Sequence, residues 1–195
     1  MGTTRARGGG ATARKVPSTA STAASRPEVN ANTAHYALTT RWLLAAPIVR
    51  IWPVLTSPET WSAWWKYVVA IEPLEVGDAD GVGALRRYTW SSRLPYRLTF
   101  DMRTTAIAKP VWIEGVAQGE LTGTGRWDLA ENATGTRVQY TWRVSTGKRW
   151  MNMLAPLLAP VFAWNHDQVM AEGGRGIARH LGVRLLAYEG AASGA

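Results

Sequence analysis

The stretch Trp150–Leu186, WMNMLAPLLAPVFAWNHDQVMAEGGRGIARHLGVRLL, is the long helical pattern of the chain. A turn of 100° per residue separates a polar side from a mainly apolar arc. The arc contains Phe162, His166, Val169, Met170, Gly173, Gly176, Ile177, His180 and Leu181. Its centre is glycine, and it carries histidine where a packed core favours leucine. The pattern predicts a helix that covers a cavity, preceded by an apolar segment with Pro156 that ends at about Pro160.

Three glycines lie close together on this helix, at Gly173, Gly174 and Gly176. Each costs about 0.5 to 1 kcal/mol relative to alanine in a helix interior, so another interaction must offset the loss. Two explanations carry equal weight. Either the helix packs very close to another element here, or the small residues leave room for a ligand.

A succession of strand patterns precedes the helix. Apolar and polar residues alternate from Ala34 to Trp42, which predicts a first strand with one buried face. Six further strands, separated by turn signals, are predicted at Val68–Val76, Leu85–Trp90, Tyr96–Lys109, Val111–Leu121, Gly125–Ala130 and Arg137–Thr146. Their short connections favour an antiparallel meander.

Two short helices are predicted between the first and second strands. Pro47 opens one, and Ser57, Pro58 and Glu59 open the other as cap, first helical residue and first-turn acid. Trp61, Trp64 and Trp65 follow at the spacing of one helix face. This face is interpreted as core packing, with a ligand wall as the alternative.

The predicted fold is therefore α+β: a helix-grip fold with a seven-stranded curved antiparallel sheet wrapped around a long C-terminal helix. The domain is expected to span residues 34–187. Residues 1–33 are rich in Gly, Ala, Ser, Thr and Arg, which predicts a disordered basic tail, and residues 188–195 are expected to form a disordered C-terminal tail.

Composition excludes several classes of function. The absence of cysteine excludes disulfides, thiolate nucleophiles and cysteine metal sites. Half of the formal charge of +8 lies in the tail, where five basic residues stand against one acidic residue before position 34. Arginine and aromatic residues alternate along the strands and so lie on opposite faces, which argues against a nucleic-acid surface. The longest apolar run is shorter than the roughly 20 residues of a membrane span, and no signal-peptide core is present, so the expected location is cytoplasmic.

The sequence resembles the START/Bet v 1-like (SRPBCC) superfamily, of the polyketide cyclase/dehydrase and lipid-transport type. The resemblance covers about residues 34 to 187. It is carried by Ser57-Pro58-Glu59, Trp61, Trp64-Trp65, Gly77-Asp78, Gly81, Gly83, Leu94-Pro95-Tyr96, Gly119-Glu120-Leu121, Gly125, Trp127, Trp164-Asn165-His166, Met170 and Gly173. It implies a deep hydrophobic cavity between sheet and helix that binds lipids, sterols, polyketides, hormones or quinones. Some members are cyclases, hydratases or dehydratases, without universal catalytic residues.

Two residues are candidates for chemistry. His166 lies on the inner arc and is a candidate acid, base or hydrogen-bonding group, although a structural histidine bonded to a backbone carbonyl is the favoured interpretation. Glu114 is a candidate acid if its strand face points inward. A solvated Glu114 is favoured, because a buried carboxylate without a partner is costly.

The expected function is binding of a hydrophobic small molecule: a lipid, a polyketide-like compound or an isoprenoid. The alternatives are a cyclase or dehydratase that uses His166 or Glu114, and a protein-interaction module. The predicted ligand-binding residues are Trp42, Tyr88, Trp90, Tyr96, Phe100, Tyr140, Trp142, Phe162, Asn165, His166, Val169 and Gly173.

Metal and cofactor sites are not expected. The three histidines show no metal-ligand spacing, and neither a Walker A loop nor a nucleophile elbow is present. Residues 150–162 are apolar and follow Lys148 and Arg149, which suggests transient contact with an anionic membrane during ligand exchange. Ordinary packing of the helix start is the alternative. None of these patterns bears on the oligomeric state.

Overall fold

The computed structural model describes residues 1–2, 35–93, 96–146 and 149–190, without the side chains of 35, 36, 146 and 149–159. Within these described residues the fold starts with strand β1, helix α1 and the 3-10 helix η1, continues through six strands, and closes with helix α2 and strand β8. The bounds are β1 His35–Leu44, α1 Ile48–Leu55, η1 Pro58–Ala63, β2 Val68–Glu75, β3 Leu85–Trp90, β4 Leu98–Ala108, β5 Trp112–Gly119, β6 Leu121–Asn132, β7 Gly135–Thr146, α2 Arg149–Leu181 and β8 Leu185–Glu189.

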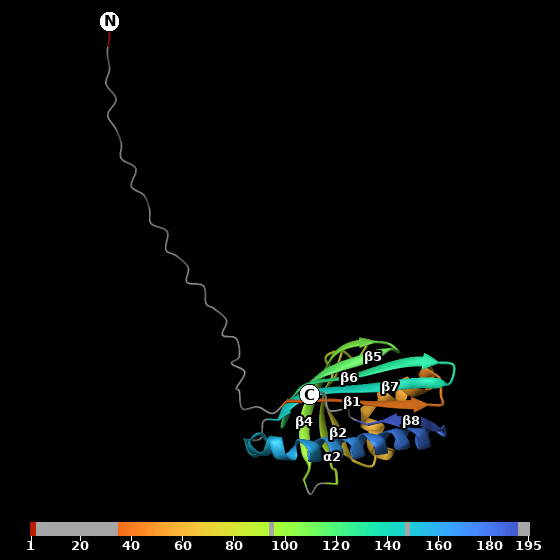
Figure 1. Ribbon diagram of the computed structural model, residues 1–195. Coiled ribbons are helices and arrows are strands. Elements are labelled where there is room, and N and C mark those ends of the chain that lie inside the picture. Colours follow the sequence, from red (N-terminus) through yellow and green to blue (C-terminus); the bar gives the residue numbers. More distant parts are fainter. Residues whose placement is uncertain (3–34, 94–95, 147–148, 191–195) are drawn as a thin grey trace.

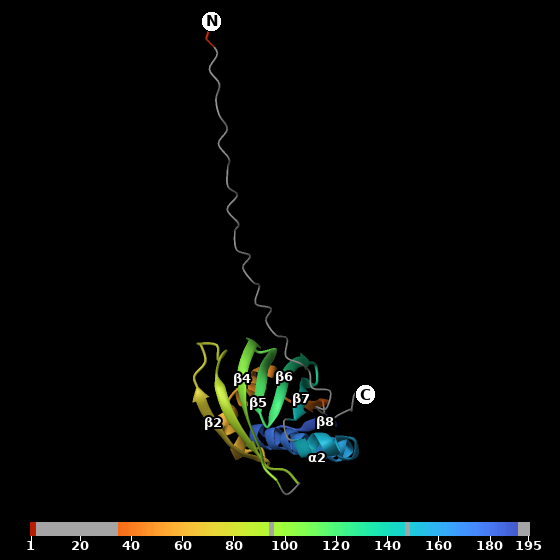
Figure 2. The same cartoon turned by 90° about the vertical axis from the view of Figure 1, so that its left-hand side faces the viewer.

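The strands form one antiparallel sheet in the order β2-β3-β4-β5-β6-β7-β1-β8. The sheet arches over α2, which crosses its concave side (Figure 1), and the curvature is clear in the perpendicular view (Figure 2). Alternation along the strands puts large apolar side chains on the concave face, such as Leu38 and Trp42 in β1 and Val138 and Trp142 in β7. The predicted α+β helix-grip architecture and its meander are confirmed.

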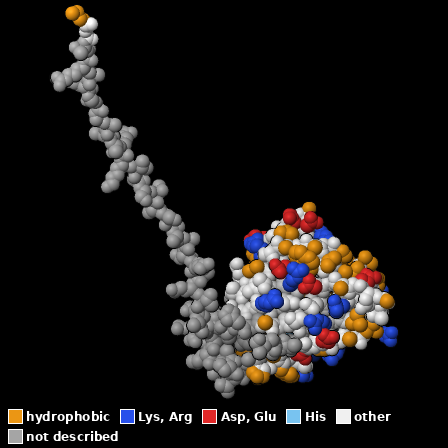
Figure 3. Space-filling model, turned by 45° about the horizontal axis from the view of Figure 1, so that its top comes forward, with side chains coloured by type: hydrophobic (Ala, Val, Ile, Leu, Met, Phe, Trp, Pro, Cys, Tyr) orange, Lys and Arg blue, Asp and Glu red, His pale blue; other side chains and the backbone are white. Residues whose placement is uncertain are grey.

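The convex face carries the charges. Arg87 pairs with Asp101 across β3 and β4, with Nε 2.8 Å from Oδ1, and Arg103 pairs with Glu75 at 2.7 Å. Figure 3 shows one face of the molecule on which basic and acidic side chains are mixed. Basic side chains of the sheet are thus largely accompanied by acids there.

Strand β8 corrects the sequence-based prediction at the C-terminal end. The helix was expected to reach Leu186, but Gly182 adopts a positive φ of 65° and ends it at Leu181. The chain then turns back, and Leu185–Glu189 pairs with β1 as an eighth strand. The ordered domain therefore extends beyond residue 187. The expected tails at 3–33 and 191–195 lie outside the described residues.

Two helix predictions also need correction. A single helix, α2, is assigned from Arg149 onward, so no division at about Pro160 is seen in the backbone. The second short helix is a 3-10 helix, and Ser57 before it makes no side-chain capping bond.

The three glycines of α2 are explained by close packing. A Cβ atom added to Gly173 would lie 2.3 Å from Cε2 of Trp65, and one added to Gly176 would lie 2.2 Å from the backbone oxygen of Trp64. A Cβ at Gly174 would lie 3.0 Å from Cδ1 of Trp42. The missing side chains let the tryptophans that follow η1 and the one in β1 press against the helix backbone, so the space is filled by the protein itself.

Candidate functional site

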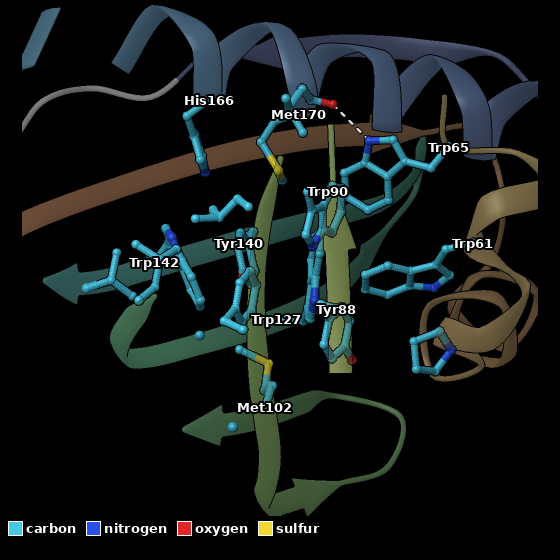
Figure 4. A pocket seen from close by; sticks show the side chains of 18 of the residues that line it. Trp61, Trp65, Tyr88, Trp90, Met102, Trp127, Tyr140, Trp142, His166 and Met170 are labelled. Atoms are coloured by element: carbon cyan, nitrogen blue, oxygen red, sulfur yellow. Dashed lines mark hydrogen bonds between the residues drawn. The ribbon is translucent and has the colours of Figure 1, made fainter. Parts of the chain in front are cut away.

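A cavity of about 220 Å³ lies between the concave face of the sheet and the part of α2 from Phe162 to Met170. It begins where the glycine contacts end: at Gly173 the helix touches Trp65, and one to three turns earlier it stands away from the sheet. Figure 4 shows α2 above this space and the aromatic side chains of η1 and the strands around it. The close packing at one end of the helix thus leaves a hollow under the preceding turns.

Aromatic side chains form a large part of the wall. Alternation along β3 turns Tyr88 and Trp90 inward, and the same alternation in β7 turns Tyr140 and Trp142 inward. The ring of Tyr88 stacks on Phe100 at 5.7 Å, and further contacts join Trp127 to Tyr140 at 4.3 Å and Tyr140 to Trp142 at 5.7 Å. These mutual contacts fix the rings in place and give the cavity a preformed, flat-sided shape.

Gly125 in β6 makes room for part of this wall. A Cβ atom there would lie 2.6 Å from the hydroxyl oxygen of Tyr140 and 2.7 Å from Cζ3 of Trp142. The two rings therefore lie directly over the strand backbone. A side chain at this position would push both rings into the cavity.

The polar groups on the helix side are Asn165 and His166. Both line the cavity, and Nδ1 of His166 and Oδ1 of Asn165 are buried without a hydrogen-bond partner. Figure 4 shows the imidazole of His166 directed from α2 towards the rings of β7. Nδ1 is therefore not held by a backbone carbonyl, which was the favoured interpretation of this histidine.

Burial in this apolar space lowers the pKa of His166 from 6.5 to about 4, and the carboxylate of Asp167 opposes the shift only in part. Burial also raises the pKa of Tyr88 and Tyr140 above the ordinary value of a phenol. Near neutral pH these three lining groups are uncharged. The site is suited to an uncharged guest.

Charged residues are confined to the edge of the cavity. Arg86 lines it, but its Nε lies 2.6 Å from Oε1 of Glu59. Glu114 also contributes to the lining, yet its side chain is 37% exposed and faces Arg126 at 3.7 Å. The buried residues of β5 are Gly115 and Ala117, so Glu114 belongs to the opposite, solvated face of the strand.

Ten of the twelve predicted ligand-binding residues line the cavity: Tyr88, Trp90, Tyr96, Phe100, Tyr140, Trp142, Phe162, Asn165, His166 and Val169. Trp42 and Gly173 do not. Trp42 is only 1% exposed and packs on Trp65 and Trp127, at 5.6 and 5.3 Å between ring centroids. Gly173 is covered by Trp65. Both residues support the wall from behind.

The sequence analysis missed several lining residues. Trp61 and Trp65 were assigned to the core, and they are buried, but their inner edges also form part of the cavity wall. Trp127 and Met102 are lining residues as well. Their inward alternation in β6 and β4 was visible in the sequence and would have identified both.

The predicted membrane-contact segment, residues 150–162, lies mostly among side chains that the structure does not describe. Phe162 lines the cavity, whereas Val161 and Trp164 are 38% and 46% exposed. Membrane contact stays a prediction. Among the described residues, none of the helices is both long enough and apolar enough to cross a membrane.

No cluster of three or more potential metal ligands from His, Cys, Asp and Glu is found within the described ranges.

Comparison with known proteins assigns this chain to a protein family. A family model described as polyketide cyclase / dehydrase and lipid transport matches residues 36–186. The chain belongs to this family. No curated protein matches the sequence.

Solved structures share the fold of this family member. A protein from Thermus thermophilus superimposes with a TM-score of 0.59 at 14% identity, over 75% of this chain and 99% of that chain. The di-domain ARO/CYC StfQ from the steffimycin biosynthetic pathway gives 0.57 at 12% identity, over 76% of this chain and 52% of that chain. The Zhui aromatase/cyclase from Streptomyces sp. R1128 gives 0.50 at 17% identity, over 74% and 96%. At these identities the likeness shows the fold alone.

Proposed function

We propose that this chain binds an uncharged hydrophobic small molecule in the cavity between the sheet and α2. The observation that carries the proposal is an aromatic-walled space of about 220 Å³ that the protein's own side chains leave open. Binding sites for small molecules are typically concave, mostly apolar and preformed, with a few placed polar groups. The ring contacts in the wall and the polar pair Asn165 and His166 fit that description.

The cavity volume limits the size of the guest. A cavity of roughly 150 Å³ takes up benzene, whereas drug-sized ligands occupy roughly 300 to 1,000 Å³. At about 220 Å³ this cavity suits a compact molecule of one or two rings, such as a small polyketide-like or cyclic isoprenoid compound. A lipid with two acyl chains is much larger.

The candidate acid–base groups favour binding over catalysis. An efficient general base has a pKa near the working pH, and the pKa of His166 is lowered to about 4. Glu114 faces Arg126 on the solvated side of β5. Family membership supports a cyclase or dehydratase as the alternative. This alternative can be tested, because an enzyme would release the bound ligand in chemically altered form.

Native mass spectrometry of the purified full chain tests the proposal, combined with solvent extraction of any bound species. A Val169→Phe variant places a larger side chain in the cavity and should reduce ligand occupancy. Gln168→Phe adds the same ring at the neighbouring position, which does not line the cavity, and should bind as the native protein does. The proposal fails if no species co-purifies and naphthalene, used as an apolar probe, does not bind to the native chain in calorimetry.

A further inference from the structure

Among the described residues, half of the buried side-chain polar atoms without a hydrogen-bond partner belong to residues that line the cavity. The described buried atoms without a hydrogen-bond partner comprise Oγ1 of Thr40, Nε1 of Trp42, Nε1 of Trp64, Nε1 of Trp90, Oδ1 of Asn165 and Nδ1 of His166. The last three belong to lining residues. Folded proteins satisfy nearly all buried polar atoms, so an unpaired group in a cavity wall indicates a partner that is not part of the chain.

The three atoms differ in what they require. Oδ1 of Asn165 can only accept a hydrogen bond, and Nε1 of Trp90 can only donate one. Nδ1 of His166 accepts or donates, depending on which ring nitrogen carries the proton of the neutral imidazole. A guest that satisfies this set must both give and receive hydrogen bonds.

We propose that Asn165 and His166 form a polar subsite for a hydroxyl group on a compact, uncharged ring compound, and that Trp90 donates to an oxygen of the same guest. This inference rests on the proposed function and names the ligand class for that site. A neutral hydroxyl has a proton for Oδ1 of Asn165 and lone pairs for a donor.

Other oxygen groups fit less well. A carboxylate has no proton for Oδ1 of Asn165, and its charge would enter a space whose described charged lining residues, Arg86 and Glu114, are each accompanied by an opposite charge. A ketone or ether accepts from Trp90 but leaves Asn165 unsatisfied. The subsite therefore discriminates between oxygen groups of similar size.

The orientation of the guest follows from the positions of these residues. Asn165 and His166 are lining residues of α2, and Trp90 belongs to β3 in the wall. Figure 4 shows the imidazole of His166 projecting from the helix. The hydroxylated edge of the ring faces the helix, and the faces of the ring lie along the aromatic walls. Asn165 and His166 then contact the substituent from the helix side, and the sheet side holds the ring and supplies the Trp90 donor.

Titration calorimetry on the full chain near neutral pH tests the subsite with four probes of one ring size: naphthalene, 2-naphthol, 2-methoxynaphthalene and 2-naphthoate. One or two hydrogen bonds to buried partners should make 2-naphthol bind about 10-fold more tightly than naphthalene. The methoxy compound should lose most of that gain because it cannot donate, and the naphthoate should bind most weakly. These comparisons need only the native protein.

Variants locate the effect. Asn165→Leu and His166→Phe should bring the ratio between 2-naphthol and naphthalene affinities close to one while naphthalene still binds. Gln168→Leu, on the same helix but outside the cavity lining, should retain the native ratio. Equal binding of naphthalene and 2-naphthol, or tightest binding of the naphthoate, would overturn the subsite and leave the proposed function standing. Failure of all four probes, together with the absence of any co-purifying species, would refute the proposed function itself.

Discussion

Replacing Gly173 by alanine tests whether the glycines of α2 exist for close packing. The new Cβ would lie 2.3 Å from Cε2 and 2.4 Å from Cζ2 of Trp65, whereas carbon atoms in contact prefer about 3.5 to 4.0 Å. One of the two groups must therefore move by more than an ångström. In an unhindered helix the same change would stabilise the protein by about 0.5 to 1 kcal/mol.

Trp65 has little freedom to give way. It is 1% exposed, its Nε1 donates to the backbone oxygen of Val169 at 2.8 Å, and its ring lies 5.1 to 5.6 Å from those of Trp42, Trp61, Trp64 and Trp90. Overpacking costs about 1 to 3 kcal/mol, and loss of the hydrogen bond adds about 0.5 to 1.5 kcal/mol. After subtraction of the helix gain, Gly173→Ala should lower the free energy of unfolding by about 0.5 to 4 kcal/mol.

Urea unfolding followed by far-ultraviolet circular dichroism measures this difference. The same change in a Trp65→Leu background should cost much less, because the obstructing ring is absent, so the double-mutant cycle should be strongly non-additive. Gly174→Ala, whose Cβ would lie 3.0 Å from the ring of Trp42, should cost less than Gly173→Ala. A Gly173→Ala variant as stable as the native protein, or more stable, would refute the packing argument.

Three further predictions concern single side chains. Burial keeps His166 neutral in the folded state, so the native protein should lose stability as the pH falls. Relative to a His166→Phe variant, its free energy of unfolding should be highest above about pH 6.5 and fall by on the order of 3 kcal/mol towards pH 4. Urea unfolding across that range measures the difference, and parallel pH profiles of the two proteins would contradict the prediction. Tyr188→Phe removes the hydroxyl that donates to Asp167, so it should cost about 1 to 3 kcal/mol and accelerate amide exchange in β8, and unchanged exchange would count against it. Glu114→Gln should leave naphthalene affinity unchanged in calorimetry. It should alter the free energy of unfolding by less than about 1 kcal/mol, because the pair with Arg126 is long, at 3.7 Å, and the two side chains are 37% and 33% exposed. A lost affinity would restore Glu114 as a site residue.

The sheet was predictable because its signal is local and repeated. Alternation in β4 and β7 assigns each residue to one face, and a helix long enough to cover the concave face is a physical necessity. The same alternation placed Tyr88, Phe100, Tyr140 and Trp142 in the cavity wall. A short strand such as β8 lacks this repetition. In the sequence Leu185 and Leu186 extend the apolar pattern of α2, but Gly182 ends the helix before them.

The roles of individual helix residues were harder to predict. Periodicity assigned Gly173 to the inner face of the helix, but it carries no information about the distance between helix and sheet. Close packing and an open cavity opposite this glycine are therefore both compatible with the same sequence pattern. Trp42 shows the same difficulty. Its side chain points inward, but the rings of Trp65 and Trp127 lie between it and the cavity, and the sequence pattern does not show such a covering layer. For Trp61 and Trp65, core packing and a ligand wall are not exclusive alternatives, because each indole is buried in the core and also lines the cavity.

The tryptophan cluster has an optical consequence. Six indoles, from Trp42, Trp61, Trp64, Trp65, Trp90 and Trp127, form a continuous chain of contacts with centroid separations of 5.1 to 6.4 Å. At such separations an excitation absorbed by one ring passes readily to its neighbours. Four of the rings, Trp61, Trp65, Trp90 and Trp127, also border the cavity. A guest that quenches any of these four rings should therefore lower the fluorescence of the whole cluster, so the intrinsic tryptophan emission of the protein reports whether its cavity is occupied.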